Sequence, residues 1–312
     1  MKRMQNQAKS ASKRTWREKG TYVKKNWQLY LFFLMPGLLL TIIFKYLPMG
    51  GLLIAFEDYN VIKGVLGSPW VGLEYLSRFL SSPDFMSYLM NPLNLSIYGL
   101  LWGFTVHILL ALLLNRIQKT GIKKKVQLLI YMPNFISVIV LCGMVRMFLS
   151  PVGPLNKVLG IRTNWMTMPS AFRTIYIASG IWQAAGWASI MYTAALSNAS
   201  KELEEAALMD GANLLQQIWY VELPAIKNII VIQFILQAGN IMSIGFEKAY
   251  ALQTDMNLPA SEILSTYVYR IGLLNGDYGY STAVGLFNSV VNVILLIFVN
   301  QVVKKLNDGE GL

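Results

Sequence analysis

The sequence predicts an all-α, polytopic membrane protein with six transmembrane helices and both termini in the cytoplasm. Of its 312 residues, 54% are hydrophobic and only 14% are charged, and apolar runs recur along the whole chain. Soluble globular domains carry about 25% charged residues. The runs follow one another without a long linker, so we expect one transmembrane domain over residues 29–303.

The first 28 residues form a basic tail that contains nine Lys or Arg and one acid, Glu18. The tail ends directly at the first apolar run, as a cytoplasmic segment facing anionic lipid would. It could instead begin a signal peptide, but no small-residue cleavage site follows residues 29–44, so we expect it to stay uncleaved. Because the formal charge of +11 is concentrated here and in short loops, it predicts contact with membrane lipid and not with nucleic acid.

Six runs are long enough, or nearly so, to cross a hydrocarbon core that needs about 20 residues. They are residues 29–48, 93–114, 126–149, 172–196, 229–250 and 282–303.

The loops between these runs predict their orientation, because Lys and Arg concentrate on the cytoplasmic side. Five basic residues crowd 116–125, and Lys304 and Lys305 begin the C-terminal tail of residues 304–312. The loops 49–92, 150–171 and 251–281 hold five basic residues against seven acids. We therefore place those three loops outside the cell, and the loop of about 197–228 in the cytoplasm.

This last loop is the largest one predicted to face inward, and its sequence predicts a helix, a glycine turn and a second helix. "SKELEEAALMD" combines strong helix formers with an N-cap candidate, Ser200, and acids in the first turn. Gly211 follows, and glycine ends helices because it accepts a left-handed conformation. The second helix is expected over residues 213–222, and Pro224 fits the first turn of the next one.

The spacing in this loop resembles the EAA motif of ABC importer permeases. Glu205-Ala206-Ala207, three residues, Gly211, nine residues and Val221-x-Leu223-Pro224 match that motif apart from Val221 in place of Ile. The resemblance implies that the loop is a coupling helix that docks on a cytoplasmic ATPase. Glu205 would then contact the ATPase, Ala206 and Ala207 would permit close approach, Gly211 would make the turn, and Glu202, Glu204 and Asp210 would add charge contacts. The alternative is a solvated acidic connector, which explains the acids but not the spaced Gly and Leu-Pro.

Three further stretches are similar to permeases of the maltose-like carbohydrate class, in the branch for oligosaccharides and polysaccharide fragments. They are "FKYLPMGGLLIAFEDYN", "GSPWVGLEYLSRFL" and "DGANLLQQIWYVELPAI". The resemblance implies a non-catalytic subunit in a bacterial cell membrane that forms half of a pathway. Its partners would be a homologous permease, a dimer of ABC ATPase and an extracytoplasmic solute-binding lipoprotein. It also implies the ABC type I importer permease fold, with ATP and Mg bound by the ATPase and no cofactor on this chain.

The sequence holds no phosphate-binding P-loop, and its single Cys142 and single His107 offer no metal cluster or nucleophilic triad. We expect His107 to be a packed or hydrogen-bonded helix residue. A peptide or amino acid as the solute stays open. A membrane enzyme is disfavoured by the missing catalytic cluster, and an ion-driven carrier by the scarcity of acids within the runs.

Sugar paths combine aromatic faces with amide and hydroxyl groups, and three runs offer such residues. The candidates are Trp182, Gln183, Trp187, Tyr192, Gln233, Gln237, Asn240, Asn288 and Asn292. Gln233, Gln237 and Asn240 share one helix face by their spacing. The amide residues could instead join helices by side-chain hydrogen bonds.

Overall fold

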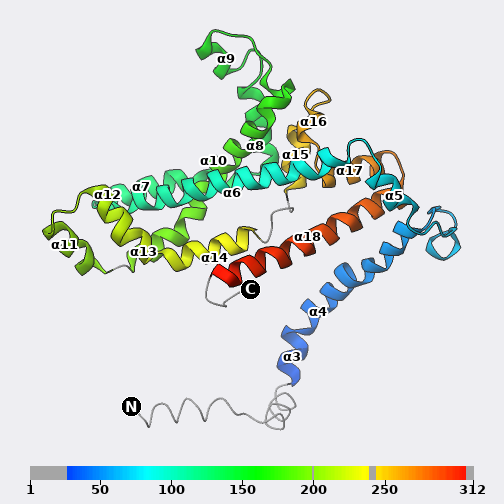
Figure 1. Ribbon diagram of the computed structural model, residues 1–312, viewed down its shortest axis with the longest axis horizontal. Coiled ribbons are helices and arrows are strands. Elements are labelled where there is room, and N and C mark those ends of the chain that lie inside the picture. The colour runs from blue at the N-terminus through cyan, green and yellow to red at the C-terminus, as the bar shows by residue number, and fades with distance from the viewer. Residues whose placement is uncertain (1–26, 199, 239–243, 307–312) are drawn as a thin grey trace.

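The computed structural model describes residues 27–198, 200–238 and 244–306 (Figure 1). Within these ranges the chain is helical, and its one pairing of extended residues is an isolated bridge between Glu57 and Trp70. The all-α prediction is therefore confirmed.

Three helices are long and apolar enough to cross a membrane in the described part of the chain. They are Met35–Phe56, Phe85–Asn115 and Tyr278–Gln301. The first joins α4 (Met35–Thr41), η1 (Ile42–Tyr46) and η2 (Leu47–Phe56), and a short α3 (Trp27–Phe33) precedes it. The second is α6 (Phe85–Asn115), and the third belongs to α18 (Tyr278–Leu306).

Two further segments reach spanning length only as bent pairs. Thr120–Phe135 and Val138–Phe148 meet at 97°, and Leu214–Ala225 and Lys227–Gln237 meet at 66°. The first pair contains α7 (Thr120–Tyr131), η4 (Met132–Phe135) and α8 (Val138–Phe148). The prediction of one continuous helix over 126–149 is wrong, because Pro133 opens a short 3-10 segment and Ser137 starts a new helix.

The predicted run 229–250 is likewise not one described helix. α14 (Lys227–Ala238) ends before residues 239–243, which lie outside the described ranges, and α15 (Phe246–Leu252) follows. Two other boundaries also differ, because the first spanning helix continues to Phe56 past Pro48, and α6 begins eight residues before residue 93.

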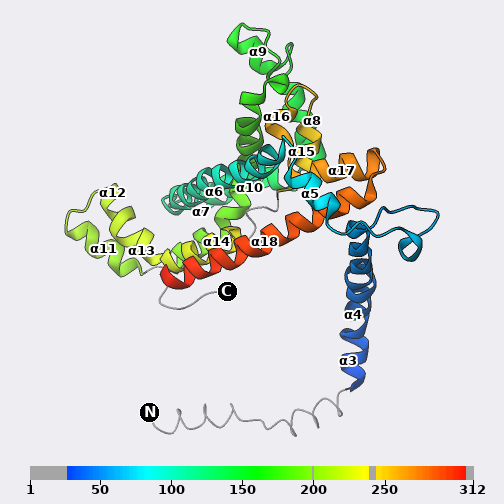
Figure 2. The same ribbon diagram turned by 45° about the vertical axis from the view of Figure 1, so that its right-hand side comes forward.

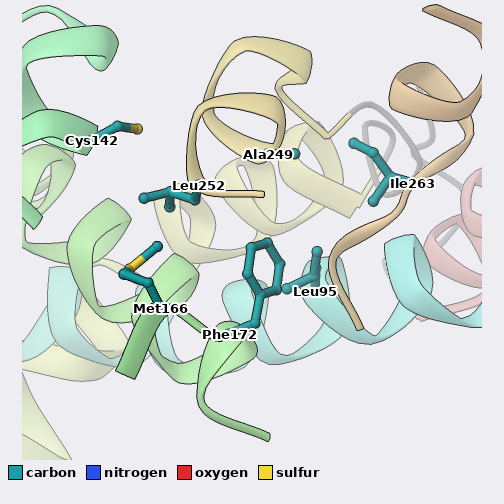
Figure 3. Packing of buried hydrophobic residues seen from close by; sticks show 7 residues of the cluster. All are labelled: Leu95, Cys142, Met166, Phe172, Ala249, Leu252 and Ile263. Carbon is teal, nitrogen blue, oxygen red and sulfur yellow. The ribbon is translucent and has the colours of Figure 1, made fainter. Parts of the chain in front are cut away.

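The 29-residue α10 (Pro169–Ser197) is long enough to span but is less apolar than the three helices above. Its polar residues Ser179, Ser189 and Thr193 are buried, and it packs along α6. A hydrophobic cluster around Leu95, Phe172 and Ile263 joins α6, α8, α10 and α15 (Figure 3). α10 therefore lies at the centre of the bundle, where small and polar side chains permit close packing.

The remaining helices are short and connect the long ones. They are η3 (Val65–Gly67), α5 (Glu74–Leu80), α9 (Pro154–Leu159), η5 (Trp165–Thr167), α11 (Lys201–Met209), α12 (Leu214–Gln217), η6 (Ile218–Glu222), α13 (Leu223–Ala225), α16 (Leu258–Ser261), α17 (Leu264–Tyr269) and η7 (Arg270–Leu274).

The first spanning helix projects away from the body and contacts it through η2, which packs on α18 (Figure 1). Helices α11 and α12 lie at one end of the long axis, and α5 and α17 lie at the other end in both views (Figure 2). The predicted cytoplasmic loop and two of the predicted outer loops, 49–92 and 251–281, thus place these helices at opposite ends, whereas α9 in the third predicted outer loop projects separately at the top of both views.

Candidate functional site

The loop between α10 and α14 forms the expected helix, turn and helix. Gly211 has a φ of +76°, and it follows α11 directly. The Gly211 N–H donates to the Leu208 carbonyl at 3.1 Å, and the Ala212 N–H donates to the Ala207 carbonyl at 2.9 Å. These two bonds are the Schellman pattern that closes a helix on a left-handed residue. Glycine at 211 is therefore required by the backbone.

The second helix begins with a reciprocal cap. The Asn213 side chain accepts from the Gln216 N–H at 3.0 Å, and the Gln216 side chain accepts from the Asn213 N–H at 2.8 Å. The helix continues through η6 to Glu222, as the sequence predicts. Ser200 occupies the N-cap position of α11 with extended backbone, as the sequence predicts, although its hydroxyl accepts no bond from a backbone N–H of that helix.

Most of the motif residues face solvent on this projecting loop. Glu202, Glu205, Ala206, Asp210, Gly211 and Pro224 are exposed, whereas Glu204, Ala207 and Leu223 are half-buried. Large apolar side chains are exposed beside them, among them Met209 at 88% and Leu215 at 75%. An acidic and apolar surface at the tip of a capped loop is suited to docking on another protein.

A buried polar network joins this loop to the end of α6, and the sequence did not lead us to it. The Glu222 carboxylate is fully buried, accepts from Asn115 Nδ2 at 2.9 Å and pairs with Arg116 at 3.1 Å. Arg116 also donates to Gln217 Oε1 at 2.9 Å, and Gln217 Nε2 donates to the Ala212 carbonyl at 2.8 Å. The chain of contacts therefore runs from α6 to the residue after Gly211. One sequence feature could have indicated this network: the acid Glu222 directly precedes Leu223-Pro224 at an otherwise apolar helix start.

The path candidates on α10 lie on different faces of that helix. Trp182 lines an apolar cavity of about 380 Å³ between α8 and α10, and Trp187 packs edge-on against Phe135. Gln183 lines a different cavity and donates to the Ile136 carbonyl at 2.8 Å, at the break between η4 and α8. Tyr192 is 1% exposed and belongs to a core cluster with Ile226.

The other path candidates lie on α14 and α18. Gln233 and Gln237 are half-buried on α14, and Asn288 and Asn292 are half-buried on α18. Asn288 lines a cavity of about 440 Å³ together with Phe246 and Tyr269. Asn240 lies outside the described residues. The structure thus does not gather these residues in one cavity, and their contact with a solute stays a prediction.

Comparison with known proteins agrees with this geometry. Residues 99–308 match the family model described as the binding-protein-dependent transport system inner membrane component. Protein LplB of Bacillus subtilis (strain 168) is 40% identical over 295 residues, covering 93% of this chain and 92% of that protein. The polygalacturonan/rhamnogalacturonan transport system permease protein YteP of the same strain is 41% identical over 302 residues, covering 95% and 94%.

A solved structure is also similar over nearly the whole chain. It is a chain of a bacterial alginate ABC transporter in complex with an alginate pentasaccharide-bound periplasmic protein. The two chains align with a TM-score of 0.83 at 35% identity, covering 96% of this chain and 100% of that one. The chain therefore belongs to the family of binding-protein-dependent transport system inner membrane components.

Proposed function

We propose that the chain is the permease subunit of an ATP-driven importer for oligosaccharides or polysaccharide fragments in a bacterial cell membrane. The relatives support this solute class, because one is a polygalacturonan/rhamnogalacturonan permease and another belongs to an alginate transporter. Subunits of this family are not enzymes, and ATP with Mg binds to a partner ATPase.

The proposed topology has six spans with both termini in the cytoplasm. One of the six, the run 126–149, is bent, and α10 is a less apolar central span. The Lys and Arg asymmetry of the loops supports this orientation, as does the position of α11 and α12 at the end opposite to α5 and α17.

The proposed assembly contains a second, homologous permease, two ATPase subunits and a solute-binding lipoprotein. The complex of the alginate transporter with its periplasmic protein supports the last of these partners. Each permease would form half of the pathway, and the binding protein would deliver the sugar to the outer loops.

Transport in this proposal is alternating access driven by differential binding in two states. The exposed α11 and its Gly211 turn dock on the ATPase and follow its closure. The Arg116–Glu222 network carries that movement to α6, because a buried ion pair with further hydrogen bonds holds the loop and the helix in one fixed relation. The observation that carries the proposal is this capped loop, with the EAA spacing on its exposed face.

Reconstitution tests the function directly. The chain, its partner permease, the ATPase and the loaded binding protein are placed in proteoliposomes, and uptake of labelled oligosaccharide is measured with and without ATP. We expect uptake that requires ATP and the binding protein and that exceeds uptake of a peptide of similar mass. Uptake that follows an imposed ion gradient without ATP would contradict the proposal and indicate a secondary carrier.

A further inference from the structure

A cavity of about 290 Å³ lies between α6, α10 and α15, inside the helix bundle. Glycines and polar side chains line much of its wall, which includes Gly99, Gly103, His107, Gly180, Gln183 and Lys248. Neither the motif nor the predicted sugar path accounts for Lys248.

Lys248 places a cation at this cavity, and its side chain is only 8% exposed. Its Nζ donates to the Tyr176 carbonyl at 2.6 Å and lies 4.5 Å from the centre of the Tyr176 ring. A Cβ at position 180 would come within 2.7 Å of the same nitrogen, so Gly180 leaves the room that the ammonium occupies. Tyr176 and Gly180, on neighbouring turns of α10, thus fix the position of the ammonium: Tyr176 contacts it and Gly180 leaves space for it.

No carboxylate neutralises this cation within the described part of the chain. The ion pairs found there are Arg78–Asp277, Arg116–Glu222 and Arg270–Glu262, and no Asp or Glu lines the cavity. An ammonium has three donors, and the Tyr176 carbonyl takes one of them. An unpaired charge inside a membrane protein is costly and marks a functional site.

A second cation lines a neighbouring cavity. This cavity of about 460 Å³ shares Ile177 and Ile181 with the first and is lined by Arg173 and Tyr98. The Arg173 guanidinium lies 5.4 Å from the centre of the Tyr98 ring, and it forms none of the three ion pairs above. Arg173 and Gly180 are seven residues apart on α10, which is roughly 10 Å along the helix axis.

His107 adds a second unused polar group to the first cavity. Its Nδ1 has no hydrogen-bond partner among the described residues, and its ring lies beside Gly103. We call these two neighbouring cavities together the α6–α10 groove. Their walls contain two cations, an imidazole and tyrosine rings, and no acid lines either cavity.

We propose that this groove is a subsite for the carboxylates of an acidic, uronate-containing oligosaccharide, with Lys248 as its inner anion-binding residue. A hydrogen bond from an ammonium to a carboxylate is stronger than one to a neutral hydroxyl, because both partners are charged. Arg173 forms the outer part of the same subsite. The inference rests on the proposed function and narrows its solute class.

The test compares one acidic oligosaccharide with its carboxyl-reduced form, which has the same length and linkages but no charge. ATP-driven uptake of each is measured in proteoliposomes with a binding protein that captures both. The variants are Lys248→Gln, Lys248→Arg and Gly180→Ala, with Lys304→Gln on an exposed lysine of α18 as the matched control. Purified yield and basal ATP hydrolysis check that each complex assembles.

We expect Lys248→Gln to lower uptake of the acidic form roughly ten- to a hundredfold while changing the reduced form little. Gly180→Ala should have the same selective effect because its methyl group displaces the ammonium, and Lys248→Arg and Lys304→Gln should retain acidic uptake. An equal loss of both sugars, or no loss, would show that Lys248 only holds α15 against α10 and would overturn the subsite. If the unaltered transporter moves neither sugar with ATP, the proposed function itself is wrong.

Discussion

At the scale of single residues, the contacts of Glu222 could not be predicted from its neighbours in the sequence. The Gly211 turn and the second helix from residue 213 could be predicted, because left-handed turns and helix starts depend on a few consecutive residues. The partner of Glu222, Asn115, lies 107 residues away in the sequence, and only the packing of α6 against the loop brings them together. Lys248 is a similar case, because its cavity is formed by three helices.

Removing the Glu222 carboxylate should destabilise the protein. Glu222→Leu removes the acceptor of Asn115 Nδ2 and leaves Arg116 with Gln217 but without a carboxylate, which costs roughly 2–3 kcal/mol, below the value for a fully buried pair because Arg116 retains 29% exposure. We expect a fall of about 3–5 °C in the thermal unfolding midpoint of this chain in the purified complex. The double variant Arg116→Met/Glu222→Leu should recover part of this loss, because it removes both charges.

Arg78→Gln is the control, because the Arg78–Asp277 pair spans 3.5 Å and its side chains are 62% and 33% exposed. Its cost should stay below about 1 kcal/mol. A Glu222→Leu complex as stable as Arg78→Gln would contradict the role given to the network.

At the scale of elements, the break between η4 and α8 is the main departure from the sequence prediction. Residues 126–149 are apolar throughout most of their length, so hydropathy predicts one span. The break depends on Pro133, on Ser137 as the cap of α8, and on the bond from Gln183 to the Ile136 carbonyl. Pro133 and Ser137 are local signals, whereas the bond from Gln183 to the Ile136 carbonyl needs the neighbouring α10.

Two serines that occupy similar positions test this account of the break. The Ser137 hydroxyl accepts from the Val140 N–H at 3.3 Å, whereas Ser200 at the start of α11 makes no such bond. Ser137→Ala should cost about 1 kcal/mol and increase hydrogen exchange in the first turn of α8, and Ser200→Ala should change stability little. Equal effects of the two substitutions would contradict the assigned cap.

At the scale of the whole molecule, the sequence predicted the family and the all-α fold better than it predicted the course of the individual helices. The Lys and Arg asymmetry is counted over whole loops, so an error of a few residues in a span boundary changes the predicted orientation little. The course of the chain inside the bundle depends on helix contacts, such as those that surround α10, and composition does not reveal them.

Labelling of introduced cysteines tests the proposed topology in a Cys142→Ser background. Positions 10, 120, 212 and 308 should be protected from an impermeant reagent added to intact cells, and positions 70, 160 and 265 should be labelled. Each position should react after the membrane is opened, which controls for burial. Labelling of position 212 from outside would contradict both the orientation and the coupling role.

The central claim is that the capped loop couples the pathway to the ATPase without contacting the sugar. Sugar-stimulated ATP hydrolysis of the assembled transporter tests it most directly, in the variants Glu205→Lys and Gly211→Pro. Glu205 is exposed at the proposed docking surface, so a lysine there reverses the charge that we propose is offered to the ATPase, and proline fixes φ near −65° where the backbone has +76°.

Lys305→Glu, a charge reversal on an exposed residue near the end of α18, is the matched control. We expect both loop variants to insert and to bind the loaded binding protein, and to lose most of the sugar-stimulated hydrolysis that the control retains. Normal sugar-stimulated hydrolysis in both Glu205→Lys and Gly211→Pro would contradict the account, because the loop would then be only a connector.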